Sequence, residues 1–531
     1  MVATARALQV GERSYPVVLP SIRDPRLHLA SVIIAIHVLG QLGLGFNVSI
    51  PQILSAIFTA AILEVILTFA LVGALMWPAS AMLTGSGVAL ILRDVGTVHG
   101  EYWSWRNWQT FALVAAFSVL TKYVFKFRGT HIFNPSNVGL VVAFLLLGSE
   151  RVEPLDFWWS PLNGWMILAY AIILTGGILI TSRLNLLSMG VAFWATLTAA
   201  VGVLAASGHC FVARWSFAPV CGSSFWWVII TSPEVLIFLF FMITDPKTTP
   251  RGNVARVAFG VAVAILATLL MAPQTTEFGA KVGLLAALVV VCAVRWLFDR
   301  LPAAGSEGDR IGAVAARFAR TDGVTGGVTG LAGRIVITLG GVVVLAAAIV
   351  VAGIPARGTA EVPPDVLAEA GVVVDPAVVP EVTIDPEVAR FSPDLATADG
   401  ASALGLTLVE NLEVESVALL ESDPALLTGV DHGDRLVEMQ NRLNDGISRG
   451  VLTVDRYSFD SMHLVVLQPF GMQSGLSAGI EGTGTVEHVT YDADGRATDS
   501  VTEPFTETFA LRQVTGERWL LVSVAATSSQ P

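Results

Sequence analysis

Residues 53–76 read ILSAIFTAAILEVILTFALVGALM, an apolar run that contains a single charged residue, Glu64. An α-helix of about 20 such residues spans roughly 30 Å of hydrocarbon. Across the whole chain 53% of the residues are hydrophobic and only 14% are charged, which is unusual for a soluble protein. We therefore expect an all-α polytopic membrane protein, in which ten further apolar runs are also spans: 28–46, 79–92, 107–125, 135–148, 162–181, 186–206, 223–243, 255–272, 277–297 and 335–354.

The distribution of basic residues predicts the orientation, because Lys and Arg accumulate in cytoplasmic loops. Runs 79–92 and 135–148 are short, but counting both as spans places every strongly basic loop on the side of the N-terminus. A re-entrant 79–92 would move the basic loop 300–334 outside. The expected order is a cytoplasmic N-terminus (1–27), a membrane core (28–298), a cytoplasmic linker (299–334), an eleventh helix (335–354) and an extracytoplasmic C-terminal part.

The composition changes after the last apolar run. Residues 355–531 contain 9 Arg, no Lys and 28 Asp and Glu, a net charge of about −19 that argues against nucleic-acid binding. A Pro-rich, acidic linker at 355–400 precedes an expected extracytoplasmic α+β domain at 401–531. There, 402–419 alternate loosely, 432–449 have helical periodicity, and four segments alternate as strands: 451–468, 478–491, 502–514 and 517–525. Helices followed by long strands resemble NTF2-like domains, and we favour a binding or assembly role over catalysis.

The three cysteines do not form a metal-binding pattern. Cys292 lies in an apolar run and is expected to be a packed small side chain, while Cys210 and Cys221 share one predicted external loop. A disulfide between them and two free thiols are both compatible with this spacing. The histidines of the tail are scattered without metal-ligand spacing, so we predict no metal site.

A few polar residues lie within the predicted spans, where such groups are costly unless they pair or serve a function. Glu64 is either an ion or proton site or a structural partner of Lys122. His37 is expected to be a packing residue. Glu234, next to Pro233, is expected to lie shallow enough to be hydrated.

Two polar motifs that contain proline directly adjoin apolar runs: 131–137, HIFNPSN, and 242–250, MITDPKTTP. Proline at a helix end frees backbone groups, and each motif adds hydrogen-bonding side chains and nearby cations. Such a cluster can hold a polar or anionic ligand. It can equally be a helix cap that anchors a span, and these residues alone do not decide between the two.

The chain resembles the RnfD/NqrB family, the membrane subunits of the Rnf and sodium-pumping NADH:quinone oxidoreductase complexes. The resemblance covers about residues 20–300 and rests on motifs that occur in the family order. They are Met82-Leu83-Thr84-Gly85 with the apolar residues after it, Ile132-Phe133-Asn134-Pro135, Gly176-Gly177 followed by Arg183, Met242-Ile243-Thr244-Asp245-Pro246, and Glu277 near the last core span.

The resemblance implies a ten-span core of two inverted halves, in which binding sites lie at the repeat interface. It also implies a subunit that carries flavin and relays electrons, in some cases coupled to cation movement, with partner membrane or redox subunits and possibly quinone. Carried over to this sequence, the cofactor-binding candidates are Thr84, Gly85, Asn134, Pro135, Thr244 and Asp245. The ion-pathway candidates are Glu64, Asp245 and Glu277.

The sequence departs from the family in ways that matter for function. The threonine motif through which some members attach FMN covalently is absent between the two proline motifs, and an eleventh span and a C-terminal domain are added. Divergent members of this kind occur in actinobacteria, which implies a bacterial cell membrane. We therefore expect non-covalent flavin, either FMN or riboflavin. The alternatives are a transporter-like protein without flavin, and a membrane scaffold that recruits a partner through its external domain.

Overall fold

The computed structural model describes residues 4–526 with gaps at 11–12, 22–23, 98, 128, 150, 158–161, 301–327, 358–364, 468–475, 493 and 514–517. Most of the predicted cytoplasmic linker 299–334 lies outside the described residues. The chain divides into two compact units. The helical unit comprises Met1–Phe211 and Cys221–Arg357, and the C-terminal unit comprises Val212–Val220 and Gly358–Pro531.

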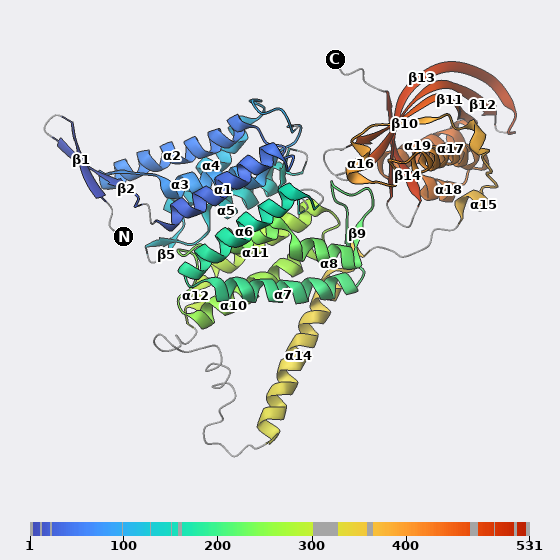
Figure 1. Ribbon diagram of the computed structural model, residues 1–531. Helices are drawn as coiled ribbons and strands as arrows, with labels where there is room; N and C mark the ends of the chain where they lie inside the picture. Colours follow the sequence, from blue (N-terminus) through green and yellow to red (C-terminus); the bar gives the residue numbers. More distant parts are fainter. Residues whose placement is uncertain are drawn as a thin grey trace. The chain divides into compact units, whose positions relative to one another are not determined.

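The helical unit consists of apolar helices that coincide with the predicted runs (Figure 1). The helices are α1 (Pro25–Leu42), α2 (Ile50–Val72), α3 (Ala79–Ile91), α4 (Trp108–Val124), α5 (Pro135–Leu147), α6 (Gly164–Arg183), α7 (Leu187–Ala206), α8 (Gly222–Thr231), α9 (Pro233–Ile237), the π-helix η1 (Phe238–Met242), α10 (Asn253–Met271), α11 (Glu277–Ala293), α12 (Arg295–Phe298) and α14 (Val328–Ala352).

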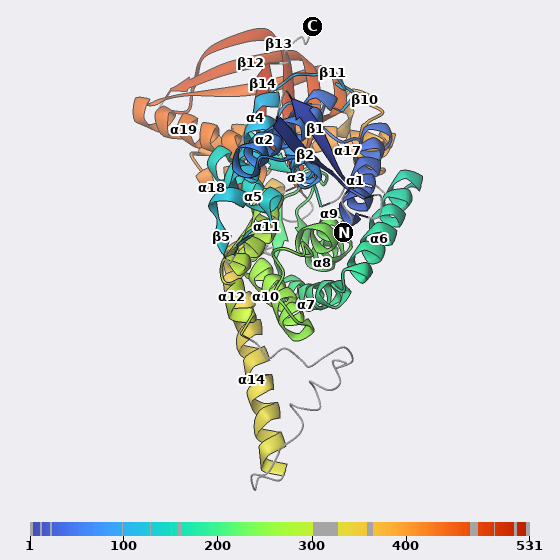
Figure 2. The same cartoon turned by 90° about the vertical axis from the view of Figure 1, so that its left-hand side faces the viewer.

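Six helical segments in the described part of the chain are long and apolar enough to cross a membrane: α1, α2, α6, α7, Gly222–Met242 and α10. The apolar helices α3 and α5 are shorter. Several long apolar helices are compatible with a multi-pass membrane protein, as the composition predicts. Their close packing is helped by glycine: a Cβ at Gly260 of α10 would lie 2.6 Å from the Met189 carbonyl oxygen of α7. Helices α7 and α10 accordingly run alongside each other (Figure 2).

The helix between residues 222 and 242 is broken, because Pro233 has no N–H to donate. Helix α8 ends at Thr231 and α9 begins at Pro233. The carbonyl oxygens near the break accept hydrogen bonds from other helices: Ile230 from the Trp194 indole (3.0 Å) and Thr231 from the Tyr170 hydroxyl (2.9 Å). The break is therefore a stable part of the fold.

An N-terminal hairpin is present that the sequence analysis did not predict. Strand β1 (Thr4–Val10) pairs antiparallel with β2 (Arg13–Leu19), and β2 pairs parallel with β3 (Leu75–Met76). Short antiparallel pairs also join β4 (Leu92–Asp94) to β7 (Val152–Pro154) and β5 (Lys126–Phe127) to β6 (Thr130–His131). Such short strands give a weak sequence signal beside long apolar helices.

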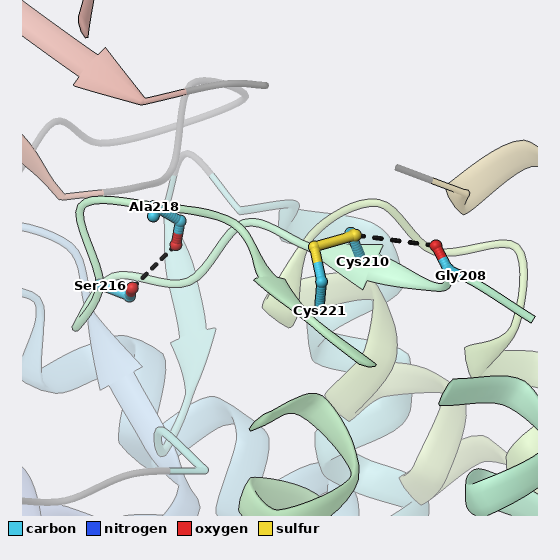
Figure 3. Close-up of a disulfide and its surroundings, with 5 residues drawn as sticks. All are labelled: Gly208, Cys210, Ser216, Ala218 and Cys221. Carbon is cyan, nitrogen blue, oxygen red and sulfur yellow. Dashed lines mark hydrogen bonds between the residues drawn. A yellow bond between two sulfur atoms is a disulfide. The ribbon is translucent and has the colours of Figure 1, made fainter. Parts of the chain in front are cut away.

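The two cysteines of the predicted external loop are joined by a disulfide, as Figure 3 shows. Cys210 belongs to β8 (Cys210–Phe211) and Cys221 to β9 (Val220–Cys221). The residues between the two strands are part of the C-terminal unit. There, Phe217 is buried, with its ring centroid 5.6 Å from that of Trp519.

The C-terminal unit is a five-stranded sheet packed against helices. The strand order is β10-β11-β12-β13-β14; β10 is parallel to β11 and the other pairs are antiparallel. The elements are α15 (Val366–Glu369), η3 (Pro376–Val378), β10 (Val382–Ile384), α16 (Val388–Phe391), α17 (Ala398–Glu421), α18 (Pro424–Val430), α19 (Gly433–Arg449), β11 (Val451–Leu467), β12 (Ser477–Asp492), β13 (Ala497–Gln513) and β14 (Trp519–Ala526).

The segment 402–419, whose apolar residues alternate only loosely, is helical and belongs to α17. Leu404, Leu408 and Leu412 recur every four residues and are buried in the main core of this unit. The four alternating segments are strands β11 to β14, which confirms a sheet-rich C-terminal region.

Candidate functional site

A cavity of about 580 Å³ lies within the helical unit. It brings together five of the six residues predicted to bind a cofactor: Thr84, Asn134, Pro135, Thr244 and Asp245. Its apolar lining comes from α1, α3, the end of α6, α9 and η1, and includes Leu29, Ile33, Leu83, Leu90, Ile91, Ile180, Ile237 and Phe240. Its polar and charged lining includes Asp24, Arg26, Ser80, Thr84, His131, Asn134, Ser136, Thr244, Asp245 and Lys247.

The two proline motifs contact each other at this cavity. One contacting pair, Asn134 and Met242, is 108 residues apart in the sequence. The Asn134 side-chain amide donates to the Met242 carbonyl oxygen (3.1 Å), and His131 Nε2 lies 3.4 Å from an Asp245 carboxylate oxygen. Met242 ends the π-helix η1, whose wide turn is closed by the Ile243 N–H on the Phe238 carbonyl. Short π-helical segments often occur at functional sites.

Asn134 also caps α5, which explains why this residue type precedes the proline. Its Oδ1 accepts from the Asn137 N–H (3.3 Å) and the Ser136 hydroxyl (2.9 Å). Proline at the first helical position lacks an N–H where none is needed. The side chain therefore serves both as the cap of α5 and as the link to the second motif.

The second motif forms a tight turn after η1. The Thr244 hydroxyl donates to the Phe240 carbonyl, and Asp245 Oδ1 accepts from the Lys247 N–H (3.0 Å). The same aspartate thus shapes the turn with one oxygen and faces His131 with the other. Across the cavity, Arg26 forms a salt bridge with Asp24 (2.5 Å).

The sixth candidate, Gly85, lies outside the cavity. A Cβ at Gly85 would lie 2.4 Å from the Ala56 carbonyl oxygen and 2.8 Å from the Ile57 Cα, so this glycine lets α3 pack against the backbone of α2. Gly87, two residues further on, lines the cavity instead.

Gly85→Ala is expected to destabilise the helical unit by about 1–3 kcal/mol, because α2 and α3 must separate to admit the methyl group. Gly87→Ala is the matched control: its Cβ would be 3.3 Å from the Ser136 hydroxyl, a side chain that can rotate. Thermal unfolding in detergent compares the two variants. Equal stability of Gly85→Ala and the wild type would contradict the packing role.

Glu64 and Lys122 pair across α2 and α4, with 3.8 Å between Lys122 Nζ and Glu64 Oε2. Lys122 Nζ also donates to the Ser80 hydroxyl (3.2 Å), and Ser80 lines the cavity. Of the three ion-pathway candidates, Asp245 lines the cavity and Glu64 is linked to it through Lys122 and Ser80.

Glu277 does not line the cavity and belongs to a second buried polar cluster. Lys281 Nζ lies 3.6 Å from Glu277 Oε1 and 3.0 Å from Asp156 Oδ1. Glu277 Oε1 accepts from the Phe157 N–H (2.7 Å). Lys281 is a charged residue within the apolar run 277–297 and could have pointed to this cluster from the sequence. Glu234, expected to be hydrated, is only 1% exposed and also belongs to this cluster.

The C-terminal unit has its own buried ion pairs. Arg435 forms two hydrogen bonds of 2.7 Å to the carboxylate of Glu415, next to Asp431. Asp455 accepts from Arg442 (2.7 Å) and lies 2.7 Å from His488 Nδ1. Among the described residues, no group of three or more His, Cys, Asp or Glu side chains is placed to hold a metal ion.

Asp431→Asn is expected to stabilise the C-terminal unit at neutral pH. Burial, together with the neighbouring Glu415, raises the pKa of Asp431 well above its ordinary value of 3.8. Between 3.8 and that raised pKa, the folded state keeps a proton that the unfolded state has lost, so stability falls as pH rises. Unfolding temperatures should show a gain at neutral pH that disappears near about pH 4. A gain independent of pH would contradict this account.

No known protein-family model matches the chain, and no curated protein matches it. The class is therefore defined by the fold and the site. The chain combines a set of long apolar helices, compatible with a multi-pass membrane protein, with a sheet-rich C-terminal unit. The helical unit encloses an apolar cavity with charged and polar groups where two proline motifs meet.

Proposed function

We propose that the chain is a membrane subunit of an electron-transfer system that binds a flavin, FMN or riboflavin, non-covalently in the cavity. The observation that carries the proposal is the convergence of Thr84, Asn134, Pro135, Thr244 and Asp245 on one cavity. These are the positions that the family resemblance singled out as cofactor-binding. Helix capping alone does not require the two motifs to share a cavity.

The residues present fit a flavin. A cavity of about 580 Å³ is within the range of small-molecule and cofactor sites. Its walls offer aliphatic side chains and Phe240 to an aromatic ring system. The hydroxyls of Ser80 and Ser136, the His131–Asp245 pair and two cations supply hydrogen-bond donors and acceptors for a polar ring edge and a ribityl chain.

Each part of the lining has a distinct task in this proposal. A bound flavin would supply one- and two-electron redox chemistry. Lys247, and Arg26 beside Asp24, supply positive charge that stabilises a phosphate group or an anion. The contact between His131 Nε2 and the Asp245 carboxylate fixes the orientation of both side chains at the cavity. The apolar walls of α1, α3 and α6 exclude water, which strengthens these electrostatic interactions.

The proposal extends to the architecture. The helices before residue 300 would form a ten-span core of two inverted halves, and the cavity would lie at their interface near the broken helices, where such folds bind ligands. The cavity would face the cytoplasm of a bacterial cell. The NTF2-like C-terminal unit would lie outside the cell. Partner redox subunits would exchange electrons with the flavin, with quinone as an acceptor, and cation translocation would be coupled to this transfer.

The test is the visible absorption spectrum of protein purified in mild detergent. The proposal predicts flavin bands that remain with the protein through gel filtration and pass into the filtrate after denaturation, since no attachment threonine motif lies between the proline motifs. A colourless protein with the unfolding profile of a folded chain, and without affinity for added riboflavin or FMN, would contradict the proposal. Such a result would favour the transporter-like or scaffold alternatives.

A further inference from the structure

The second buried cluster of the helical unit contains more carboxylates than cations. Lys281 and Arg93 are the cations, and Asp156, Glu234 and Glu277 are carboxylates around them. Lys281 is already bound, because Nζ contacts the Pro154 carbonyl oxygen (2.9 Å), Asp156 and Glu277. Arg93 directs Nη1 to the carbonyl oxygens of Ala89 (3.2 Å) and Leu92 (2.8 Å).

Glu234 is the member of this cluster without a hydrogen-bond partner among the described residues. Both of its carboxylate oxygens are buried and unpartnered, and the residue is 1% exposed. The nearby Ser232 hydroxyl accepts from the Glu234 backbone N–H (3.1 Å) and leaves the carboxyl group unpaired. An ionised carboxylate in such a place costs several kcal/mol, whereas a protonated one does not carry this penalty.

We propose that Glu234 is a proton-binding site of the helical unit, which carries a proton at neutral pH and exchanges it with solvent through the cluster. The proton is favoured over a metal ion because no metal-binding group of three or more His, Cys, Asp or Glu side chains occurs in the described part of the chain. The helical unit would thus have two binding sites: the cavity would bind the ligand, and Glu234 would bind the proton.

The neighbouring charges give the proton a route. Asp156, after β7, has a side chain that is 39% exposed and contacts Lys281, which in turn contacts Glu277 on the same helix, α11. The charged groups that act on Glu234 are Lys281 and Glu277 of α11, Asp156 and, from β4, Arg93. Glu153 of β7 also acts on Lys281. Direct contacts therefore link the partly exposed Asp156 to Lys281 and Glu277, and the last step of the route is from this group to the unpartnered Glu234 carboxyl.

Infrared spectroscopy of the full chain in lipid vesicles tests the site. The wild type should show the carbonyl stretch of a protonated carboxyl group at neutral pH, and this band should shift after transfer to D₂O. Because the buried Asp431 carboxyl of the C-terminal unit also keeps a proton above its ordinary pKa, the comparison is made in an Asp431→Asn background. In that background Glu234→Gln should remove the band, while Glu277→Gln should retain it. If Glu234→Gln leaves the carboxyl band unchanged, or if the band does not shift in D₂O, the proposal is wrong.

Stability provides a second readout that does not depend on spectroscopy. Glu234→Gln replaces a carboxyl that is neutral in the folded state but ionises in the unfolded chain, so it should raise the unfolding temperature at neutral pH, and this gain should shrink as the pH falls. Glu277→Gln removes an ionised partner of Lys281 and should lower it. A loss in Glu234→Gln as large as that in Glu277→Gln would show that Glu234 is ionised. Neither readout requires bound flavin, so the redox proposal can fail without affecting this one.

Discussion

Lys281→Met is expected to destabilise the helical unit by about 3–5 kcal/mol, the usual cost of removing one partner of a buried ion pair. The ammonium group is 2% exposed and bound to Asp156, Glu277 and the Pro154 carbonyl. Methionine has a similar length and fills the space, so the loss would come from carboxylates left without their cation. Thermal unfolding in detergent at neutral pH measures the effect.

Lys126→Met is the matched control, since Lys126 lies in an exposed two-stranded pair and its ammonium group makes a cation–π contact with Tyr123 at 5.2 Å. It should change stability by no more than about 1 kcal/mol. If the two lysine variants lose equal stability, Lys281 does not hold the buried cluster together.

Arg435→Met should produce the second large loss, about 3–5 kcal/mol, in the C-terminal unit. The guanidinium group is 4% exposed and bonds both oxygens of Glu415, which is equally buried. Removing it leaves Glu415 beside the Asp431 carboxyl without a cation. The unfolding transition of the C-terminal unit, followed by hydrogen exchange of the backbone amides in β11 to β14, measures the loss.

Arg449→Met serves as the control because it removes the same side-chain type from the same helix. Arg449 pairs with Asp445 at 3.5 Å, but its side chain is 75% exposed. Exposed pairs at this spacing contribute about 0.3–0.5 kcal/mol. Stability losses of the same size in the two arginine variants would contradict the role assigned to the buried pair.

The length of the apolar runs was enough to predict the helices of the first unit. A run such as 53–76 has few alternatives to a helix in a bilayer. The four strands β11 to β14 were predicted from a different pattern, the alternation of apolar and polar residues along each segment. The N-terminal hairpin was missed, since β1 (TARALQV) and β2 (RSYPVVL) are short and mix polar with apolar residues. The helical nature of 402–419 was also missed, because both faces of α17 carry apolar residues.

Five of the six residues predicted to bind a cofactor line one cavity, but the contacts that bring them together could not be predicted. Asn134 and Asp245 could be singled out because a polar residue before proline at the end of an apolar run is informative. Nothing in the spacing could show that Asn134 contacts Met242, since this contact depends on how the helices pack. Gly85 was predicted to bind a cofactor, but a small residue in a motif can serve either helix packing or binding. Its close approach to the Ala56 backbone shows that Gly85 serves helix packing.

Buried charges were the least predictable part. Because Glu234 follows a proline, we expected its side chain to be hydrated. In the structure it is surrounded by other buried residues. Arg93, Asp156 and Lys281 come from segments far apart in the chain, and their association depends on the β4–β7 pairing and on the start of α11. Sequence alone locates such residues in apolar runs but cannot assign their partners.

The most direct measurement of the central claim is a riboflavin titration of the detergent-solubilised protein by flavin fluorescence, comparing Thr84→Phe with Leu113→Phe. Thr84 lines the cavity and is buried, whereas Leu113 of α4 is 68% exposed. We expect saturable binding to the wild type and Leu113→Phe, and at least a tenfold loss of affinity in Thr84→Phe with an unchanged unfolding profile. Equal affinities in all three proteins, or no binding to any of them, would contradict the assignment of this cavity to a flavin.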